Sequence, residues 1–409
     1  MMRIAVIAAA DLPIPAVKGG ATETLVTHLL SENSIYKQVY IDVYSRYDSL
    51  AEQKALEYDY TNIVFYKPNR FRNSIDKIVL GISRIMRILT KGKTMQKYGF
   101  IRFCAQRIKN NAYDLVLLEG NTMYARQLRH LISEKMILHI HSDMLNAQRP
   151  TDREQIVQSI DGIISVSDYE KERITSLSST QRLPIHILKN TINTNLFKPS
   201  PEGMAFRNQF RKEHGINEND FLIIYCGRIV EEKGILELIH AVKQMNHSYK
   251  LLVVGSFWFG SNKKSSYMQN LEKSCLDIMD RIFFTGYIPQ EELPMYYQAS
   301  DMAVYPSRYN ETAGLVVLEA LACGVPVIVP NFAGMAEYAP DISAIKIDTR
   351  NNCVKEICDA LNYLETHQDR YEEMKKNAVS SVQQYNLESY YHNFIDILGL
   401  FDREWEQKS

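Results

Sequence analysis

Two kinds of hydrophobic pattern alternate along the chain. Short apolar runs, of the kind found in parallel strands covered on both faces, are separated by segments whose apolar residues recur at helical spacing. The first run, RIAVIAAA, covers residues 3–10, and after a glycine-containing loop a helical pattern passes through Leu25, Leu29 and Leu30. Further strand-like segments follow at 39–45, 61–66, 113–120, 135–143 and 161–167. This alternation predicts βαβ units that build one parallel sheet.

The same pattern begins again at residues 219–229, NDFLIIYCGRI. Strands are then expected at 249–256, 281–287, 302–307 and 325–330, and helices at 234–245, 267–279, 292–300 and about 314–322. A polar stretch with two prolines, 193–203, separates the two halves. We therefore predict an α/β protein with two Rossmann-like, doubly wound domains that face each other across a cleft. The predicted domains are 1–195 and 196–386, and the final helical stretch, 387–409, is expected to pack back on the first domain.

Composition narrows the class of protein. A chain of 409 residues exceeds what one hydrophobic core usually serves, and 45% hydrophobic with 23% charged residues is ordinary for a globular protein. The six cysteines form no Cys-x-x-Cys pair, which argues against a zinc site and a disulfide scaffold and favours a reducing cytoplasm. The formal net charge of -1 gives no general attraction to nucleic acid. No apolar run approaches the roughly 20 residues that span a bilayer.

Candidate chemistry lies just after the predicted strands, because ligands of open parallel sheets bind outside the carboxyl ends of the strands. In ETAGLVVLE, residues 311–319, Glu311 precedes a helix that starts near Gly314 and contains Glu319. A helix N-terminus binds anions, and two carboxylates suit the hydroxyls of a ribose or hexose. Two glutamates alone are more often ordinary surface residues, but other loops carry matching chemistry.

Those loops supply cations and glycines. Arg228 follows a strand and Lys233 precedes the next helix, so both could converge on a diphosphate, although solvated charges are the simpler interpretation of either alone. Gly19 and Gly20 follow the first strand and allow a backbone to approach a phosphate or sugar closely. This pair is neither a full dinucleotide-binding fingerprint nor a P-loop.

Two histidines share one face of a predicted strand in ILHIHSD, residues 137–143. His141 lies at the carboxyl end, where it could bond a substrate hydroxyl, whereas a buried structural role is the simpler interpretation of His139. Metal binding is not expected here, because the sequence shows no further cluster of ligands.

Together, these motifs resemble the retaining glycosyltransferases of family 4 (glycosyl transferases group 1), which have the two-domain GT-B fold. The resemblance covers nearly the whole chain, through GRIVEEKG at 227–234, FTGYIPQEELPMYYQASDMAVYPS at 284–307, ETAGLVVLE, and the KNTINTNLFKP linker at 189–199. One departure is Ala333, since the family often has a second glycine before Gly334.

The resemblance implies a role for each matching residue. Arg228 and Lys233 would bind the donor diphosphate, Glu319 the ribose hydroxyls, and Glu311 the transferred sugar. His141 would touch the sugar from the other domain. The implied catalytic set is Glu311, His141, Arg228 and Lys233, and Glu319 belongs with the donor-binding residues. The remaining donor contacts would come from Gly19, Gly20, Tyr287, Ile288, Ala313, Gly314 and Leu315.

The implied reaction moves a hexose or N-acetylhexosamine from a nucleotide diphosphate sugar, with UDP-sugars favoured, to a hydroxyl of a glycan or lipid-linked acceptor. It would retain the anomeric configuration and need no cofactor and no metal, since the chain has no Asp-x-Asp motif. A non-catalytic partner subunit that kept the fold and a sugar-nucleotide epimerase are the alternatives. The first alternative would have little need for the complete set of Arg228, Lys233, Glu311 and Glu319. The second lacks the context of the 311–319 motif.

One segment is strongly basic: residues 67–109 hold twelve Lys/Arg and a single acid, Asp76. Apolar residues at helical spacing between 75 and 89 make part of it a basic amphipathic helix, which is typical of anionic membrane surfaces. We expect segment 70–109 to bind the inner face of a membrane, and a core-packed helix with a solvated cationic face is the alternative. No recognised RNA-binding module accompanies the segment.

Overall fold

The computed structural model describes residues 1–407 except 10, 68–97, 149–152 and 256–265. The chain forms two compact units, one made of Met1–Asn190 with Leu387–Ser409 and the other of Thr191–Asn386. Most of the basic segment falls on 68–97 and so lies outside the described residues. Among the described residues, no helix combines the length and the apolar character needed to cross a membrane.

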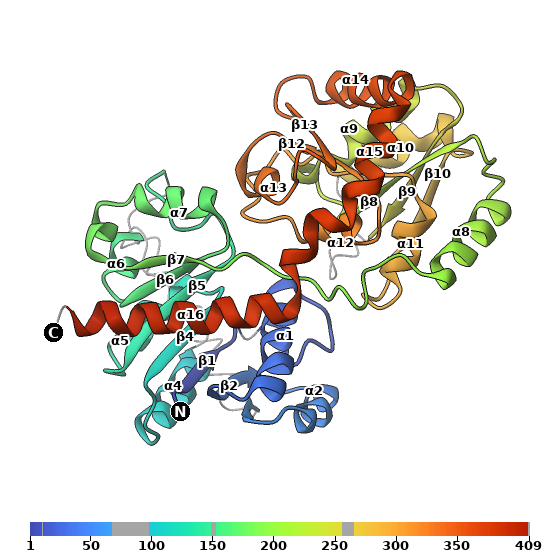
Figure 1. Ribbon diagram of the computed structural model, residues 1–409. Coiled ribbons are helices and arrows are strands. Elements are labelled where there is room, and N and C mark those ends of the chain that lie inside the picture. Colours follow the sequence, from blue (N-terminus) through green and yellow to red (C-terminus); the bar gives the residue numbers. More distant parts are fainter. Residues whose placement is uncertain (10, 68–97, 149–152, 256–265, 408–409) are drawn as a thin grey trace. The chain divides into compact units, whose positions relative to one another are not determined.

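The first unit is built on a seven-stranded parallel sheet with the strand order β3-β2-β1-β4-β5-β6-β7 (Figure 1). Its strands are β1 Arg3–Ile7, β2 Tyr40–Arg46, β3 Thr61–Tyr66, β4 Leu115–Glu119, β5 Lys135–Ile140, β6 Gly162–Ser165 and β7 Ile185–Ile187. Its described helices are α1 Ala21–Tyr36, α2 Ser49–Lys54, α4 Tyr98–Lys109, α5 Thr122–Arg129, α6 Arg153–Val157, α7 Asp168–Thr175 and α16 Leu387–Glu406.

Each face of this sheet carries its own apolar core. On one face α4, α5 and α6 pack through residues such as Phe100, Tyr124 and Ile156. On the other face α1 and α16 cover the central strands, and Phe394 of α16 shares a core with Leu29 of α1. Helix α16, red in Figure 1, thus belongs to the first unit although the second unit separates it from the rest in sequence.

The second unit is built on a six-stranded parallel sheet with the order β10-β9-β8-β11-β12-β13. Its strands are β8 Phe221–Cys226, β9 Tyr249–Val254, β10 Ile282–Gly286, β11 Met302–Val304, β12 Val327–Pro330 and β13 Ala344–Ile347. Its described helices are α8 Pro201–Glu213, α9 Ile235–Gln244, α10 Ser266–Cys275, α11 Leu293–Ala299, α12 Leu315–Ala322, α13 Ala333–Glu337, α14 Cys353–Thr366 and α15 Gln368–Ala378.

Both sheets reverse their strand order beside the first strand of the unit, at β1 and β4 in one and at β8 and β11 in the other. This is the arrangement of a doubly wound α/β domain, and its ligand site is expected at the carboxyl ends of these strands. The predicted α/β class with two doubly wound parallel sheets is therefore confirmed. The predicted cleft between the domains stays a prediction.

Candidate functional site

The loop after β8 positions Lys233 in the second unit. The 3-10 turn Glu231–Lys233 leads into α9 through Gly234, whose φ of 73° lies in the left-handed region that favours glycine. A Cβ at Gly234 would lie 2.0 Å from the carbonyl oxygen of Pro306. Glycine is therefore required here, because it lets the loop after β8 pass directly over the loop after β11.

These two loops meet in an ion pair between Lys233 and Glu311. The Nζ atom of Lys233 lies 2.5 Å from Oε1 of Glu311, and Ser307 donates its hydroxyl to the same oxygen at 2.9 Å. The side chains of Lys233 and Glu311 are only 25% and 16% exposed, so solvent screens the pair weakly. Ser307 is held in turn by Thr349, whose hydroxyl donates to its carbonyl oxygen at 2.6 Å.

Backbone packing holds the segment between Glu311 and α12 in place. The amide of Gly334 donates to the carbonyl oxygen of Glu311 at 2.7 Å, and a Cβ at Gly334 would lie 1.9 Å from the carbonyl oxygen of Thr312. The preceding Ala333 has a φ of 59°, in the left-handed region where glycine is favoured, which explains physically why a second glycine suits this position.

The predicted anion-binding end of a helix is the start of α12. Ala313 directly precedes Gly314, which is the N-cap residue, and Leu315 is the first helical residue. The first amides of an α-helix have no acceptor within the helix, and the dipole adds positive potential there. This end of α12 follows Glu311 by only a few residues, so a carboxylate, a cation and helix amides gather in one region of the second unit.

Glu319 of α12 lies within a group of buried tyrosines. Tyr297 donates its hydroxyl to Oε2 of Glu319 at 2.9 Å, and Tyr305 lies within hydrogen-bond distance of Tyr297. Burial raises the pKa of Glu319 to about 7, although the hydrogen bond from Tyr297 lowers it somewhat. With 9% of its surface exposed, Glu319 presents little of itself to solvent.

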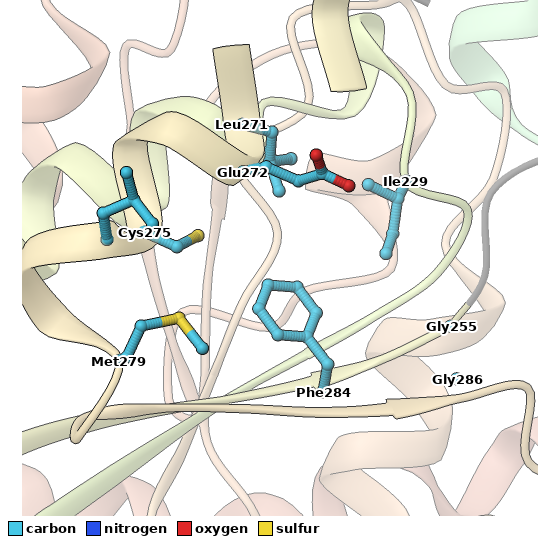
Figure 2. Close-up of a pocket in the computed structure, with 9 residues that line it drawn as sticks. Ile229, Gly255, Leu271, Glu272, Cys275, Met279, Phe284 and Gly286 are labelled. Carbon is cyan, nitrogen blue, oxygen red and sulfur yellow. The ribbon is translucent and has the colours of Figure 1, made fainter. Parts of the chain in front are cut away.

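The other residues of this unit that were predicted to bind the donor follow the ends of β8 and β10. Arg228 is exposed and follows β8, and its carbonyl oxygen accepts a hydrogen bond from Tyr225 at 2.7 Å. Tyr287 and Ile288 follow directly after β10. Beside Gly286 lies an apolar cavity of about 460 Å³ toward which Ile229, Leu271 and Phe284 point (Figure 2).

In the first unit, Gly19 and Gly20 form the turn before α1, with φ values of 72° and 99°. A Cβ at Gly20 would lie 2.2 Å from a carboxylate oxygen of Glu23. Both glycines thus have backbone conformations that L-residues rarely adopt. The turn therefore places backbone without side chains just before the N-terminus of α1. The structure places them and His141 in the first unit, and the other predicted site residues in the second.

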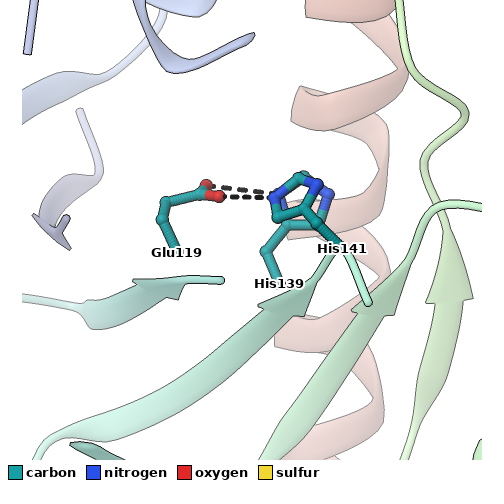
Figure 3. A group of neighbouring side chains, drawn as sticks. All are labelled: Glu119, His139 and His141. Carbon is teal, nitrogen blue, oxygen red and sulfur yellow. Dashed lines mark hydrogen bonds and ion pairs between the residues drawn. The ribbon is translucent and has the colours of Figure 1, made fainter. Parts of the chain in front are cut away.

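His141 forms a cluster with His139 and Glu119 (Figure 3). One imidazole faces each oxygen of the buried Glu119 carboxylate, His139 Nδ1 at 3.2 Å and His141 Nε2 at 2.9 Å. Burial alone would raise the pKa of Glu119, but the charge of His139 and the hydrogen bonds from both histidines lower it to about 2. The pKa of His141 is lowered, first by burial and then by His139.

Two residues of these sites are absent from the sequence prediction, Ser307 and Glu119. Each follows or ends a strand on the carboxyl side, and that position is the signal that could have found them. Glu119 also corrects one argument of the sequence analysis. The histidines do have a third potential metal ligand, because the ligand atoms of all three residues lie within 4.8 Å of one another.

Comparison with known proteins shows what this chain is similar to. Residues 206–380 match the family model described as Glycosyl transferases group 1. The Bacillus subtilis (strain 168) protein YtcC is 23% identical over 93% of this chain and 88% of its own length. Spore coat protein SA of the same organism is 24% identical over 82% of each chain. The structure of Anabaena HepE in complex with UDP and glucose aligns with a TM-score of 0.73 at 16% identity, covering 98% of this chain and 100% of HepE.

The two doubly wound units have the fold of these solved structures, and the similar proteins include glycosyltransferases. The region 206–380 that matches the Glycosyl transferases group 1 model spans β8 to β13 and contains Lys233, Glu311 and Glu319.

Proposed function

We propose that this protein is a retaining glycosyltransferase of family 4. It transfers a hexose or N-acetylhexosamine from a nucleotide diphosphate sugar, preferentially a UDP-sugar, to a hydroxyl of a glycan or lipid-linked acceptor. The product belongs to a cell-surface polysaccharide or glycoconjugate, and the reaction takes place in the cytoplasm without a metal ion. A similar protein of Salmonella typhimurium, 24% identical over 67% of this chain, is a lipopolysaccharide 1,2-N-acetylglucosaminetransferase, which supports this acceptor class.

The observation that carries the proposal is the contact of Lys233 with Glu311 just before the N-terminus of α12. A nucleotide diphosphate sugar needs two kinds of partner, cations or amides for its phosphates and hydrogen-bond acceptors for its hydroxyls. Lys233 and the first amides of α12 supply the former, and the Glu311 carboxylate supplies the latter. Few other ligand classes require both within one short region.

In the proposed reaction the chain stabilises charge and positions the sugar. The bond between the anomeric carbon and the phosphate oxygen breaks, and negative charge develops on the leaving diphosphate. Arg228, Lys233 and the α12 amides stabilise that charge. Glu311 positions the sugar through its hydroxyls, and the acceptor attacks on the face from which the phosphate leaves. The leaving phosphate takes the proton of the acceptor hydroxyl, so the charges and atoms balance.

Thermal unfolding with nucleotides tests the donor site. A ligand that binds only the folded state raises the melting temperature, so UDP or a UDP-sugar should stabilise the protein and other nucleoside diphosphates less. Lys233→Ala should lose this shift. Glu311→Gln should keep nucleotide binding but lower the turnover of the preferred sugar nucleotide by roughly 10²–10³-fold. Retention is checked by the anomeric coupling constant of the product.

The outcomes separate the alternatives. A well-folded sample that no nucleotide stabilises would favour a non-catalytic partner subunit. Conversion of the sugar nucleotide into an isomer without transfer would identify an epimerase. Near-normal turnover in both variants would contradict the assigned site.

Binding of segment 70–109 to an anionic membrane remains part of the proposal. Of this segment the structure describes α4, whose residues Ile101, Cys104 and Ile108 are buried in the first unit. Salt-sensitive flotation with anionic vesicles checks the membrane contact.

A further inference from the structure

One buried carboxylate of the second unit lies in an otherwise apolar helix. The residues of α12 from Val317 to Ala322 are all buried, and Glu319 is the one among them with a polar side chain. Burial of a charged or polar group is costly unless partners compensate it, and an apolar side chain would avoid that cost. Stability alone therefore does not explain a glutamate at this position, which points to a role in binding.

Glu319 lies beside the carboxyl end of β8. Burial, and then the nearby charge of Glu319, raise the pKa of the thiol of Cys226, the last residue of that strand, to about 12. The strand order of this sheet reverses between β8 and β11, and ligands of doubly wound sheets bind at the carboxyl ends of such strands. The carboxylate therefore lies where the ligand of the second unit is expected.

The two oxygens of the Glu319 carboxylate have different surroundings. Oε2 accepts the hydroxyl of Tyr297 at 2.9 Å. Within the part of the chain that the structure describes, Glu319 forms no other hydrogen bond, so Oε1 keeps its capacity as an acceptor. Tyr297 is 0% exposed and Glu319 is 9% exposed. The carboxylate is therefore the end of this pair that a ligand can reach.

Tyr297 is a fixed donor. Burial is the main cause that raises the pKa of its hydroxyl well above the ordinary value of 10, so the hydroxyl keeps its proton. Its ring packs edge-on against Phe197 with the ring centres 6.3 Å apart. The neighbouring hydroxyl of Tyr305 donates to the carbonyl oxygen of Val316 at 3.0 Å. A donor on a ring packed in this way holds the carboxylate in one orientation.

We propose that Tyr297 is a positioning residue of the donor site: its hydroxyl holds Oε2 of Glu319, so that Oε1 is the oxygen that accepts hydrogen bonds from the ribose hydroxyls of the nucleotide. This inference rests on the proposed function and specifies how the second unit recognises the ribose. A carboxylate held at one oxygen loses less orientational freedom when a ligand binds. The bond from Tyr297 also favours the ionised carboxylate, which only accepts hydrogen bonds.

Loss of the ribose hydroxyls provides the test. Calorimetry compares the binding of UDP and of 2′,3′-dideoxy-UDP to the full-length protein at about pH 8.5, where Glu319 is mostly ionised. The wild type should bind UDP about tenfold or more tightly than the analogue, because hydrogen bonds to charged groups contribute strongly. Tyr297→Phe should weaken UDP binding by roughly 5–20-fold and leave binding of the analogue within about twofold. A merely structural role would weaken both ligands equally.

Two further variants complete the design. Tyr371→Phe is the matched control, because Tyr371 is a buried tyrosine in the other core of this unit and donates to the carbonyl oxygen of Asp301 at 3.1 Å. It should leave both affinities unchanged. Glu319→Ala removes the buried charge, and adding Tyr297→Phe to it should weaken UDP binding no further, since the two residues act as a unit. This pair tests the proposal even where Tyr297→Phe alone folds poorly.

The pH profile of urea unfolding is a second readout that needs no nucleotide. Burial raises the pKa of Glu319 to about 7 although the hydrogen bond from Tyr297 lowers it, so Tyr297→Phe should raise this pKa further. Stabilisation by a group with a raised pKa is lost as pH rises through the folded value, so the loss should occur at higher pH in Tyr297→Phe. Cys226, Cys323 and Tyr305 also lie near Glu319, but their raised pKa values keep them neutral in this range.

Three results would overturn the proposal: equal affinity of the wild type for UDP and its dideoxy analogue, equal losses for both ligands in Tyr297→Phe, or a further loss of UDP affinity when Tyr297→Phe is added to Glu319→Ala. In each of these the protein still binds UDP, so the proposed function stands. If the wild type binds no nucleotide, the proposed function fails and the ribose contact fails with it. The pH profile then decides separately whether Tyr297 controls the ionisation of Glu319.

Discussion

At the scale of single residues, Lys233 and Glu311 already form an ion pair in the protein without a donor. Under the proposed function, a donor diphosphate therefore has to compete with Glu311 for the ammonium group of Lys233. When the phosphate takes over Lys233, Oε1 of Glu311 keeps the hydroxyl of Ser307 and has capacity for a sugar hydroxyl. In the proposed reaction, the ion pair thus leaves Glu311 available for a sugar hydroxyl, while neither charge is unpaired before the donor binds.

Glu319 gives a prediction about pH and stability. Its pKa of about 7 lies above the ordinary value of 4.5, so the folded state binds this proton more tightly than the unfolded state does. The resulting stabilisation is complete below pH 4.5 and is lost as pH rises through 7, a change of about 3 kcal/mol. The side-chain amide of Glu319→Gln is neutral at every pH and still accepts the hydrogen bond from Tyr297. This substitution should therefore remove the loss of stability at high pH.

Urea unfolding at pH 5 and pH 8 is the measurement, with both values chosen to bracket the transition. The stability of Glu319→Gln relative to wild type should increase between them. Parallel pH profiles for the two proteins would contradict the assigned pKa.

At the scale of elements, the contact between α16 and β6 depends on one glycine. A Cβ at Gly162 would lie 2.4 Å from the ring of Phe401, which is fully buried and has no room to move away. Gly162→Ala should therefore destabilise the protein by about 1–3 kcal/mol, as overpacking usually does. Thermal or urea unfolding measures the change.

The matched control is Gly399→Ala within α16 itself. There the added Cβ would meet only the guanidinium end of Arg403 at 3.8 Å, and alanine is the better helix former by about 1 kcal/mol. This variant should be neutral or more stable. Equal destabilisation by both substitutions would contradict this prediction. The loss at Gly162 could then not be assigned to its contact with Phe401.

At the scale of the whole molecule, the two units differ in how their cores are assembled. Both cores of the second unit consist of residues between Ile192 and Val382. One core of the first unit includes Tyr390, Phe394 and Phe401 of α16. A fragment of residues 191–386 should therefore unfold cooperatively on its own, whereas a fragment of 1–190 should not.

Circular dichroism during heating compares the two fragments. Adding residues 387–409 to the first fragment through a short linker should restore its cooperative transition. A fragment of 1–190 that unfolds cooperatively without α16 would show that this helix only covers a finished core.

Several parts of the fold follow from local patterns and others do not. Continuous apolar runs predict most strands, because a strand buried on both faces needs apolar side chains throughout. β7 and β13 are missing from the prediction, since each has only three or four residues and a polar side chain among them, His186 and Lys346. α8 begins inside the stretch assigned to the break between the domains, although Ser200 as the N-cap and Pro201 in the first turn are ordinary signals of a helix start.

The sequence by itself determined the two α/β repeats and the positions of Lys233, Glu311 and His141 after strands, because the order of strands and loops along the chain fixes which residues reach the carboxyl edges. Only the tertiary structure decided which of them touch. Ser307 joins Glu311, and Glu119 joins His141, through contacts between loops and strands that are distant in sequence. Strand register and the space that Gly234 and Gly334 leave for neighbouring backbone set those contacts, and neither leaves a periodic pattern along the chain.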